Sequence, residues 1–231
     1  MTPDEERVNG LRNYNILDTI HEEEYDDITR LAAYICQAPI ALISLVDQDR
    51  QWFKSNFGLG ARETPREQSF CAHAIRFPES TMIVPDARLD QRFSDNPLVT
   101  GDPNIVFYAG VPLVDEQGHA LGTLCVIDEQ IRELTPQQLE ALQSLARQVI
   151  KLLASRMTNM ALEVAKQELE EGRLQLSRLI DELRKGSAQD FALHKSLQEA
   201  LTAEVDLRTR ELQQANEPCH YDHSKKTVST R

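Results

Sequence analysis

The sequence is poor in cysteine, basic residues and long apolar runs, and each shortage excludes a class of protein. Four cysteines among 231 residues form no C-x-x-C pair, which argues against a disulfide framework or a zinc site. The net charge of −12 argues against nucleic acid or an anionic membrane as partner. The longest apolar run, Pro39–Val46, is too short to cross a bilayer, and the acidic start is not a secretory signal. We expect a cytoplasmic protein that binds neither nucleic acid nor membrane.

The sequence also lacks the common motifs of catalysis. It has no Gly-rich phosphate loop and no Ser-His-Asp arrangement in a suitable context, and its paired carboxylates fall on helix faces that we expect to be solvated. Cys71 and His73 offer two ligands for a metal or haem, but no third ligand is evident. We therefore predict a non-enzymatic protein, and the sequence does not identify a cofactor.

The stretch Tyr108–Asp128 is the most informative. Two apolar runs, Val111–Val114 and Leu121–Ile127, flank the turn residues Asp115–Gly118. This pattern predicts the central antiparallel hairpin of a sheet, and its arms are too apolar for either face to be solvated. We interpret Cys125, in the second arm, as a small buried hydrophobe.

Other elements follow from periodicity and from the residues that break it. Helices are predicted over Pro3–Leu17, Glu22–Cys36 and, briefly, Phe70–Ile75; strands over Ile40–Val46, Gln51–Lys54 and Thr81–Val84; and loops over Asn56–Ser69 and Asp86–Asn104. The second loop is long for a simple connection, which favours a lid or a binding loop.

The C-terminal part of the sequence is helical in pattern. Thr135 as N-cap and Pro136 at the first helical position indicate a helix start, after which one apolar stripe continues to Leu152. From Leu162 to Leu207, apolar residues recur at two heptad positions, which predicts a left-handed coiled coil. The two stripes differ in phase by one residue within Ser155–Asn159, where we expect sensing to couple to the helix.

Several motifs that occur in order resemble those of bacterial GAF domains. They are Ser69–Ile75 (SFCAHAI), Val84–Arg88 (VPDAR), Asp90–Val99 with DQRF and NPLV, Phe107–Leu113 (FYAGVPL) and Leu121–Asp128 (LGTLCVID). The resemblance is to the N-terminal sensors of histidine kinases and diguanylate cyclases. It implies an α+β fold, in which helices flank an antiparallel GAF-type sheet and a long C-terminal coiled-coil signalling helix follows.

The resemblance also implies a domain organisation. We expect an N-terminal helix over residues 1–20, a GAF domain over 21–155, the coiled-coil helix over 156–217 and a disordered tail over 218–231. No GGDEF or kinase motif follows the helix. Bilin-binding relatives place Cys and His together, whereas Ala72 separates Cys71 from His73 here, and the cysteine pattern of methionine-sulfoxide-reducing relatives is not evident.

A ligand pocket is implied between the sheet and the long connecting segments. Such a site needs aromatic walls with a few polar groups, and the candidates are Trp52, Phe70, Cys71, His73, Asp86, Arg92, Phe93, Asn96, Phe107 and Tyr108. The alternative is structural: the phenylalanines are core, His73 packs with its nitrogens satisfied, and Asp86 pairs with Arg92.

Three functional hypotheses remain open at this point. The first is a non-enzymatic sensor that binds a small molecule or a partner and transmits the change through a dimeric helix. The second is the sensory fragment of a diguanylate cyclase or histidine kinase that lacks its output domain. The third is a redox or haem sensor that uses Cys71 and His73. We expect a parallel homodimer through Leu162–Leu207, an unidentified small-molecule ligand and an output partner in trans.

Overall fold

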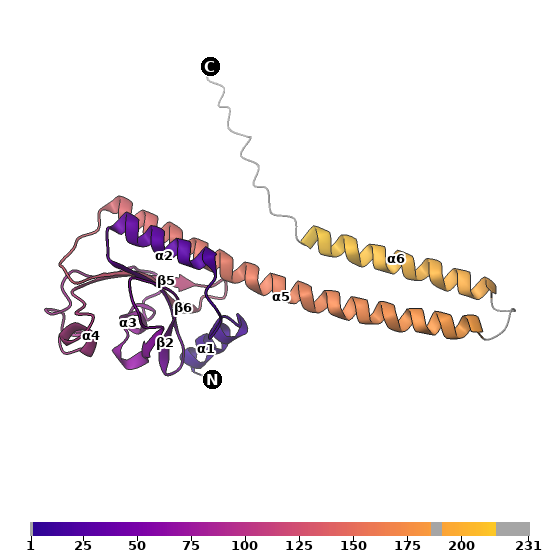
Figure 1. Ribbon diagram of the computed structural model, residues 1–231, viewed down its shortest axis with the longest axis horizontal. Helices are drawn as coiled ribbons and strands as arrows, with labels where there is room; N and C mark the ends of the chain where they lie inside the picture. The colour runs from indigo at the N-terminus through magenta and orange to yellow at the C-terminus, as the bar shows by residue number, and fades with distance from the viewer. Residues whose placement is uncertain (1, 186–190, 216–231) are drawn as a thin grey trace, which may run out of the picture. The chain divides into compact units, whose positions relative to one another are not determined.

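The computed structural model describes residues 2–185 and 191–215, which form two compact units, within residues 1–162 and 163–231. The first unit is a six-stranded antiparallel sheet flanked by helices, and a long helix leaves it (Figure 1), so the predicted α+β class is confirmed. The predicted tail over 218–231 lies outside the described residues.

The sheet has the strand order β3-β2-β1-β6-β5-β4. Its strands are β1 (Ile40–Val46), β2 (Arg50–Phe57), β3 (Glu63–Pro65), β4 (Met82–Val84), β5 (Phe107–Val114) and β6 (Ala120–Asp128). The predicted hairpin is the pair β5–β6, and every residue of β6 is buried, so the prediction of a hairpin covered on both faces is confirmed.

Alternate residues of the strands enter two separate hydrophobic cores. In β1, Ile43 and Leu45 point into a first core, which also receives side chains of α1 (Pro3–Asn13), α2 (Glu23–Cys36) and α5 (Pro136–Lys185). Leu42 and Val46 point into a second core, with side chains of α3 (Phe70–Ala74) and α4 (Pro97–Thr100). Figure 1 shows α2 beside the first part of α5 over the sheet.

Several predicted boundaries were wrong: β2 is longer than the predicted Gln51–Lys54, and α4 lies within the predicted loop Asp86–Asn104. Two further differences have local reasons. The first helix ends at Asn13 because the chain turns through left-handed residues, with φ of 46° at Asn15 and 60° at Asp18. The predicted loop 56–69 contains β3 and a 3₁₀ helix, Arg66–Gln68. Strand β3 has only three residues and no apolar alternation, so periodicity could not reveal it.

The start of α5 is as predicted. The Gln138 backbone N–H donates to Thr135 Oγ1 at 3.2 Å, and the Gln138 side chain accepts from the Thr135 N–H at 2.9 Å, which forms a capping box. The following stripe packs on the sheet, with Leu142 and Val149 fully buried.

The second unit contains the rest of α5 and α6 (Phe191–Ala215). Both helices line one groove of about 640 Å³, and α5 contributes Ala165, Leu169 and Leu176, which are on the predicted heptad positions. In α6, Leu201, Val205 and Leu212 line the groove, whereas Leu207, which is on a predicted heptad position, is 52% exposed. None of the described helices has the length and apolar character needed to span a membrane.

The β1 backbone approaches closely at Gly122 of β6, and this contact generates a prediction. A Cβ at this position would lie 1.9 Å from the Ser44 carbonyl oxygen and 2.8 Å from Leu45 Cα. We expect Gly122→Ala to lower the free energy of unfolding by about 3 kcal/mol, because two backbones would have to separate. Gly60→Ala is the matched control, since nothing lies within 4 Å of its added Cβ. Urea denaturation measures both, and equal stabilities would contradict the role of Gly122.

Candidate functional site

An aromatic cluster in the second core brings together five of the ten predicted ligand-binding residues. Phe70 stacks on Phe93 with ring centroids 3.9 Å apart, and Tyr108 lies 5.2 Å from Phe70. The His73 ring meets the edge of Phe93 at 4.9 Å, and Cys71 belongs to the same core. The rings pack directly on one another, so a ligand among them would have to move side chains.

Trp52 and Phe107 do not join this cluster. Both are buried in the first core, on the opposite face of the sheet. The reason is strand alternation: Phe107 is adjacent to Tyr108, and Trp52 to Phe53, so each pair points to opposite faces. The sequence analysis placed all ten residues around one pocket, which this geometry does not allow.

Asp86 and Arg92 lie in the loop after β4, but they do not pair with each other. Asp86 accepts two hydrogen bonds from the Arg88 guanidinium, at 2.8 and 2.7 Å. Arg92 binds Asp90 at 2.6 Å, and its guanidinium carbon lies 5.0 Å from the Phe93 ring centre. The arginines hold the pKa of both carboxyl groups below the usual value.

Asn96 has a structural position at the start of α4. Its side-chain oxygen accepts from the Leu98 N–H at 2.9 Å, and its amide donates to the Gln68 carbonyl at 3.0 Å. Asn96 therefore caps a helix and ties the long loop to the segment before α3. Both contacts are made within the chain, and neither of them depends on a ligand.

The polar centre of the second core is a pair of thiols. Cys71 Sγ lies 4.0 Å from Cys125 Sγ, and the side chains of both residues are buried. The Tyr108 hydroxyl donates to Cys71 Sγ at 3.5 Å and lies 3.4 Å from Thr123 Oγ1. Cys125 is therefore buried, as predicted, but it also has a polar partner that the sequence did not indicate.

The surroundings shift the pKa values of the two thiols in opposite directions. Burial opposes a charge on Cys71, but hydrogen bonds, first that from Cys125 and then those from hydroxyl groups that include Tyr108, lower its pKa. The hydrogen bond to Cys71, together with burial, raises the pKa of Cys125 well above its usual value. Burial also raises the pKa of Tyr108, so its hydroxyl stays protonated and can donate.

A glycine makes the room for the tyrosine hydroxyl. Gly110 lies two residues after Tyr108 on β5, hence on the same face of the sheet. A Cβ at Gly110 would be 2.1 Å from the Tyr108 hydroxyl oxygen. The Tyr-Ala-Gly sequence belongs to one of the family motifs. Its glycine leaves the space that the Tyr108 hydroxyl occupies beside Cys71.

Helix α3, which carries Cys71 and His73, is anchored to β2 by buried polar groups. Ser69, its N-cap, accepts from the Ala72 N–H at 2.9 Å and donates to Gln51 Oε1 at 2.5 Å. Gln51 also binds Thr64 of β3 at 2.5 Å. Gln51 and Ser69 were missed by the sequence analysis, although Ser before a short helix is an N-cap signal.

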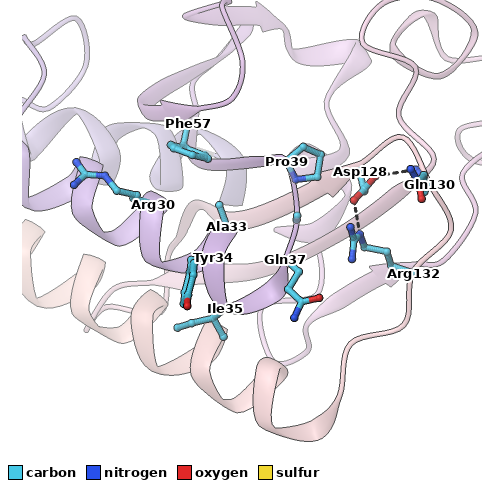
Figure 2. Close-up of a pocket in the computed structure, with 11 residues that line it drawn as sticks. Arg30, Ala33, Tyr34, Ile35, Gln37, Pro39, Phe57, Asp128, Gln130 and Arg132 are labelled. Carbon is cyan, nitrogen blue, oxygen red and sulfur yellow. Dashed lines mark hydrogen bonds and ion pairs between the residues drawn. The ribbon is translucent and has the colours of Figure 1, made fainter.

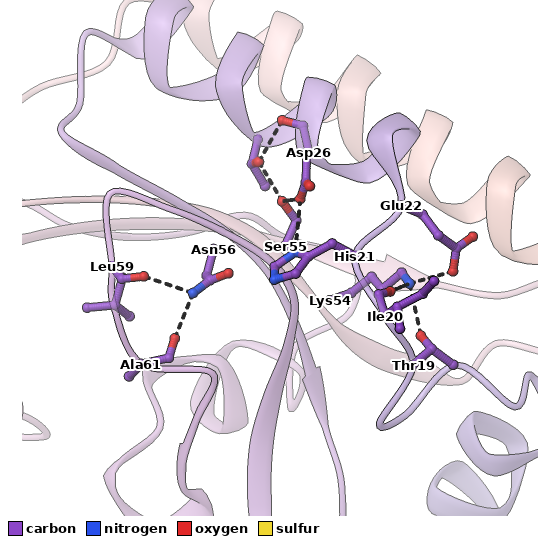
Figure 3. A network of polar contacts seen from close by, with 11 residues as sticks. Thr19, Ile20, His21, Glu22, Asp26, Lys54, Ser55, Asn56, Leu59 and Ala61 are labelled. Atoms are coloured by element: carbon purple, nitrogen blue, oxygen red, sulfur yellow. Dashed lines mark hydrogen bonds and ion pairs between the residues drawn. The ribbon is translucent and has the colours of Figure 1, made fainter.

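A buried lysine forms a second polar centre, on the other face of the sheet (Figure 3). Lys54 Nζ donates to Thr19 Oγ1 at 2.9 Å, to the Ile20 carbonyl at 2.7 Å and to Glu22 Oε1 at 2.5 Å. The same carboxylate oxygen accepts from Arg156 of α5 at 3.0 Å. One carboxylate thus joins β2, the segment before α2 and the helix that leaves the domain.

A β-bulge turns the residue after this lysine to the same side of the sheet. Ile43 and Ser44 of β1 pair with Ser55 and Phe53 of β2, which leaves Lys54 as the extra residue. Phe53 enters the second core, while Lys54 and Ser55 both turn toward the α2 side, where Ser55 Oγ donates to Asp26 at 2.6 Å. No sequence pattern indicated this bulge.

Open hollows lie outside the aromatic cluster. One of about 810 Å³ is formed beside the exposed face of α2 (Figure 2), and residues that line it include Tyr34, Phe57 and Arg132. It contains none of the ten predicted residues. A polar hollow of about 530 Å³ is lined by His73, Arg66, Arg76 and the turn after β1.

The Cys71–His73 pair was considered as a ligand set for a metal or haem. In the structure, Cys71 faces Cys125, while the His73 ring packs on Phe93. Residues two apart on a helix point in different directions, so the two side chains do not converge. Within the described part of the chain, no group of three or more His, Cys, Asp or Glu side chains is arranged to hold a metal ion.

Comparison with known proteins places this geometry in a family. Over 136 residues, 58% of this chain, the sequence is 46% identical to Cyclic di-GMP phosphodiesterase PA2567 of Pseudomonas aeruginosa. The chain spans only 23% of that relative's length.

Among solved structures, the GAF domain of an Acinetobacter phosphoenolpyruvate-protein phosphotransferase is similar at 16% identity and a TM-score of 0.49, with 67% of this chain and 95% of that chain covered. The GAF domain of Thermosynechococcus elongatus PixJ is similar at 10% identity and a TM-score of 0.48, with coverage of 64% and 92%. Residues 21–153, more than half of the chain, match the GAF domain family, and the chain therefore belongs to that family.

Proposed function

We propose that this chain is a non-enzymatic sensory module, in which the GAF domain binds a small molecule or a partner and α5 transmits the change. The observation that supports it most directly is the course of α5. Its first turns are part of the domain core, through Leu142 and Val149, and the helix continues without a break to Lys185. A change in the sheet can therefore act on the first turns of α5.

The Glu22 carboxylate is the proposed point of coupling. It is shared by Lys54, whose side chain is fully buried, and by Arg156, in the Ser155–Asn159 segment where the apolar stripes change phase. Because two cations compete for one carboxylate, a ligand that moves Lys54 changes how firmly Arg156 is held. A switch requires two discrete arrangements, and in this proposal Arg156 is held by Glu22 in one and released in the other.

The output that we propose is cyclic di-GMP turnover. The support is the similarity to a relative named as a cyclic di-GMP phosphodiesterase, of which this chain matches only 23%. Catalysis would then reside in another domain or in a partner in trans. The alternative output is a histidine kinase or a diguanylate cyclase, as the resemblance of the sequence motifs suggests.

The ligand is best sought on freshly purified full-length protein by native mass spectrometry, because this measurement reports bound molecules and oligomeric state together. We expect a mass increment that denaturation removes. A protein that carries no such increment, and that shows no change in thermal stability with nucleotides or metabolites, would contradict small-molecule sensing and favour a protein partner.

The first prediction concerns activity. Among the described residues, Cys71 and Cys125 are buried without an acid–base pair that faces a cavity, so we expect no hydrolysis or synthesis of cyclic di-GMP, no autophosphorylation and no reduction of free methionine sulfoxide. Sensitive assays of the purified chain should read background. Methionine sulfoxide reduction that is lost in Cys71→Ser would instead establish an enzyme.

The second prediction concerns the shared carboxylate. Glu22→Gln leaves the buried Lys54 without its counter-charge, so we expect the free energy of unfolding to fall by about 2 kcal/mol, less than for a fully buried pair because Glu22 is partly exposed. Glu23→Gln, at the neighbouring exposed position, is the control and should change stability by less than about 0.5 kcal/mol. Urea denaturation measures both, and equal losses would remove the special role of Glu22.

The third prediction concerns the proposed parallel homodimer through Leu162–Leu207. Leu179 and Leu207, both on predicted heptad positions, are each 52% exposed in a single chain. Association through these positions would bury them, so Leu179→Glu with Leu207→Glu should convert a dimer to a monomer. Light scattering after gel filtration gives the mass. Leu89→Glu, at an 82% exposed position in the sensory unit, is the control. A double variant as dimeric as the parent would place the interface elsewhere.

A further inference from the structure

The buried thiol pair in the second core has a chemistry of its own. We propose that Cys71 and Cys125 form a dithiol site that reacts with a small hydroperoxide and closes to a disulfide. This inference deepens the proposed sensory role by naming a class of signal. It is tested on the thiols themselves, so it can fail while ligand binding, dimerisation and the coupling at Glu22 stand.

The geometry suits a pair that is reduced at rest and able to join. The sulfur atoms are 4.0 Å apart, about 2 Å more than in a disulfide. Cys71 is on α3, a helix of five residues, whereas Cys125 is in the centre of β6, which pairs with a strand on each side. We therefore expect closure to move α3 toward β6.

The groups around Cys71 prepare it to attack. The Tyr108 hydroxyl points at its sulfur from 3.5 Å, with Thr123 Oγ1 3.4 Å behind that hydroxyl. Hydrogen bonds of this kind stabilise a thiolate, which is the reactive form of cysteine. By contrast, the pKa of Cys125 is raised, so Cys125 remains a thiol. The pair thus divides into an attacking sulfur and a resolving sulfur.

Burial indicates the class of oxidant. Cys71 is 3% exposed and Cys125 is not exposed, so bulky or charged reagents cannot reach them in the folded chain. A hydroperoxide as small as hydrogen peroxide is uncharged and similar in size to water. The site therefore favours small peroxides over large disulfide oxidants such as oxidised glutathione.

The reaction balances in two steps. The Cys71 thiolate attacks one peroxide oxygen, the O–O bond breaks, and the departing hydroxide takes the proton released by Cys71 to form water, which leaves Cys71 as a sulfenic acid. The Cys125 sulfur then attacks the Cys71 sulfur, and hydroxide leaves with the Cys125 proton as a second water. Two thiols lose two electrons in total, and one peroxide gains them.

Cys36 provides a matched control within the same chain. It is 2% exposed in the first core, and burial raises its pKa to about 11. Among the described cysteines, the sulfur–sulfur contact is between Cys71 and Cys125, and Cys36 does not take part in it. Burial without a partner and without a stabilised thiolate should leave Cys36 unreactive.

The experiment treats reduced full-length protein with one equivalent of hydrogen peroxide. The chain is then unfolded in an alkylating reagent and digested without reductant for mass spectrometry. We expect a Cys71–Cys125 linked peptide, which dithiothreitol reverses, and an alkylated Cys36. In Cys125→Ser the link cannot form, so dimedone added as the chain is unfolded should trap Cys71 as a sulfenic acid. Cys71 and Cys125 that are both alkylated after treatment, or a Cys36 that oxidises first, would overturn the proposal.

Tyr108→Phe separates chemical activation from mere proximity, because it removes only the hydroxyl. We expect disulfide formation to slow about tenfold at neutral pH, in line with the loss of a hydrogen bond to a charged group. The pH profile of the rate should shift upward, because less thiolate is present at a given pH. Circular dichroism confirms that the variant is folded. A rate and a pH profile equal to those of the parent would show that Tyr108 only fills space, and would overturn its assigned part.

Discussion

The structure depends on the complete burial of strand β6 between two cores. All of its residues are covered, and it pairs with β1 on one side and β5 on the other. This is possible because Gly122 lets the β1 backbone approach closely and because apolar side chains alternate between the faces. That arrangement places Cys125 on one face of the sheet and the first turns of α5 over the other.

Sequence patterns predicted what depends on apolar periodicity. The β5–β6 hairpin, the Thr135 cap and the apolar stripe that continues to Leu152 all follow from the spacing of hydrophobic residues or from a capping signal. Strand β3 could not be predicted in this way. It contacts β2 through a hydrogen bond between the Gln51 and Thr64 side chains, and it has no apolar stripe.

The candidate site was predicted less well than the fold. Motif order selected Phe70, Phe93 and Tyr108 correctly as neighbours, but it could not assign strand faces, so Phe107 was included although it points to the other core. The nearness of Cys71 and Cys125, which are 54 residues apart, is a property of tertiary packing alone. The bulge at Lys54 could not be predicted either, because it interrupts the two-residue alternation on which strand prediction depends.

The two polar centres meet on strand β2, and the proposed coupling would run along this strand from the thiol pair to the helix. Gln51 holds the cap of α3 on the thiol face, while Lys54 holds Glu22 on the helix face, and Glu22 holds Arg156. Between them the strand is irregular, because the bulge leaves Lys54 without a partner residue on β1. A bulge locally disrupts the ladder, so it yields more readily than regular pairing when α3 shifts. Movement at Gln51 would then shift Lys54. Arg156 on α5 would gain or lose its contact with Glu22, and the buried centre of the sheet would not change.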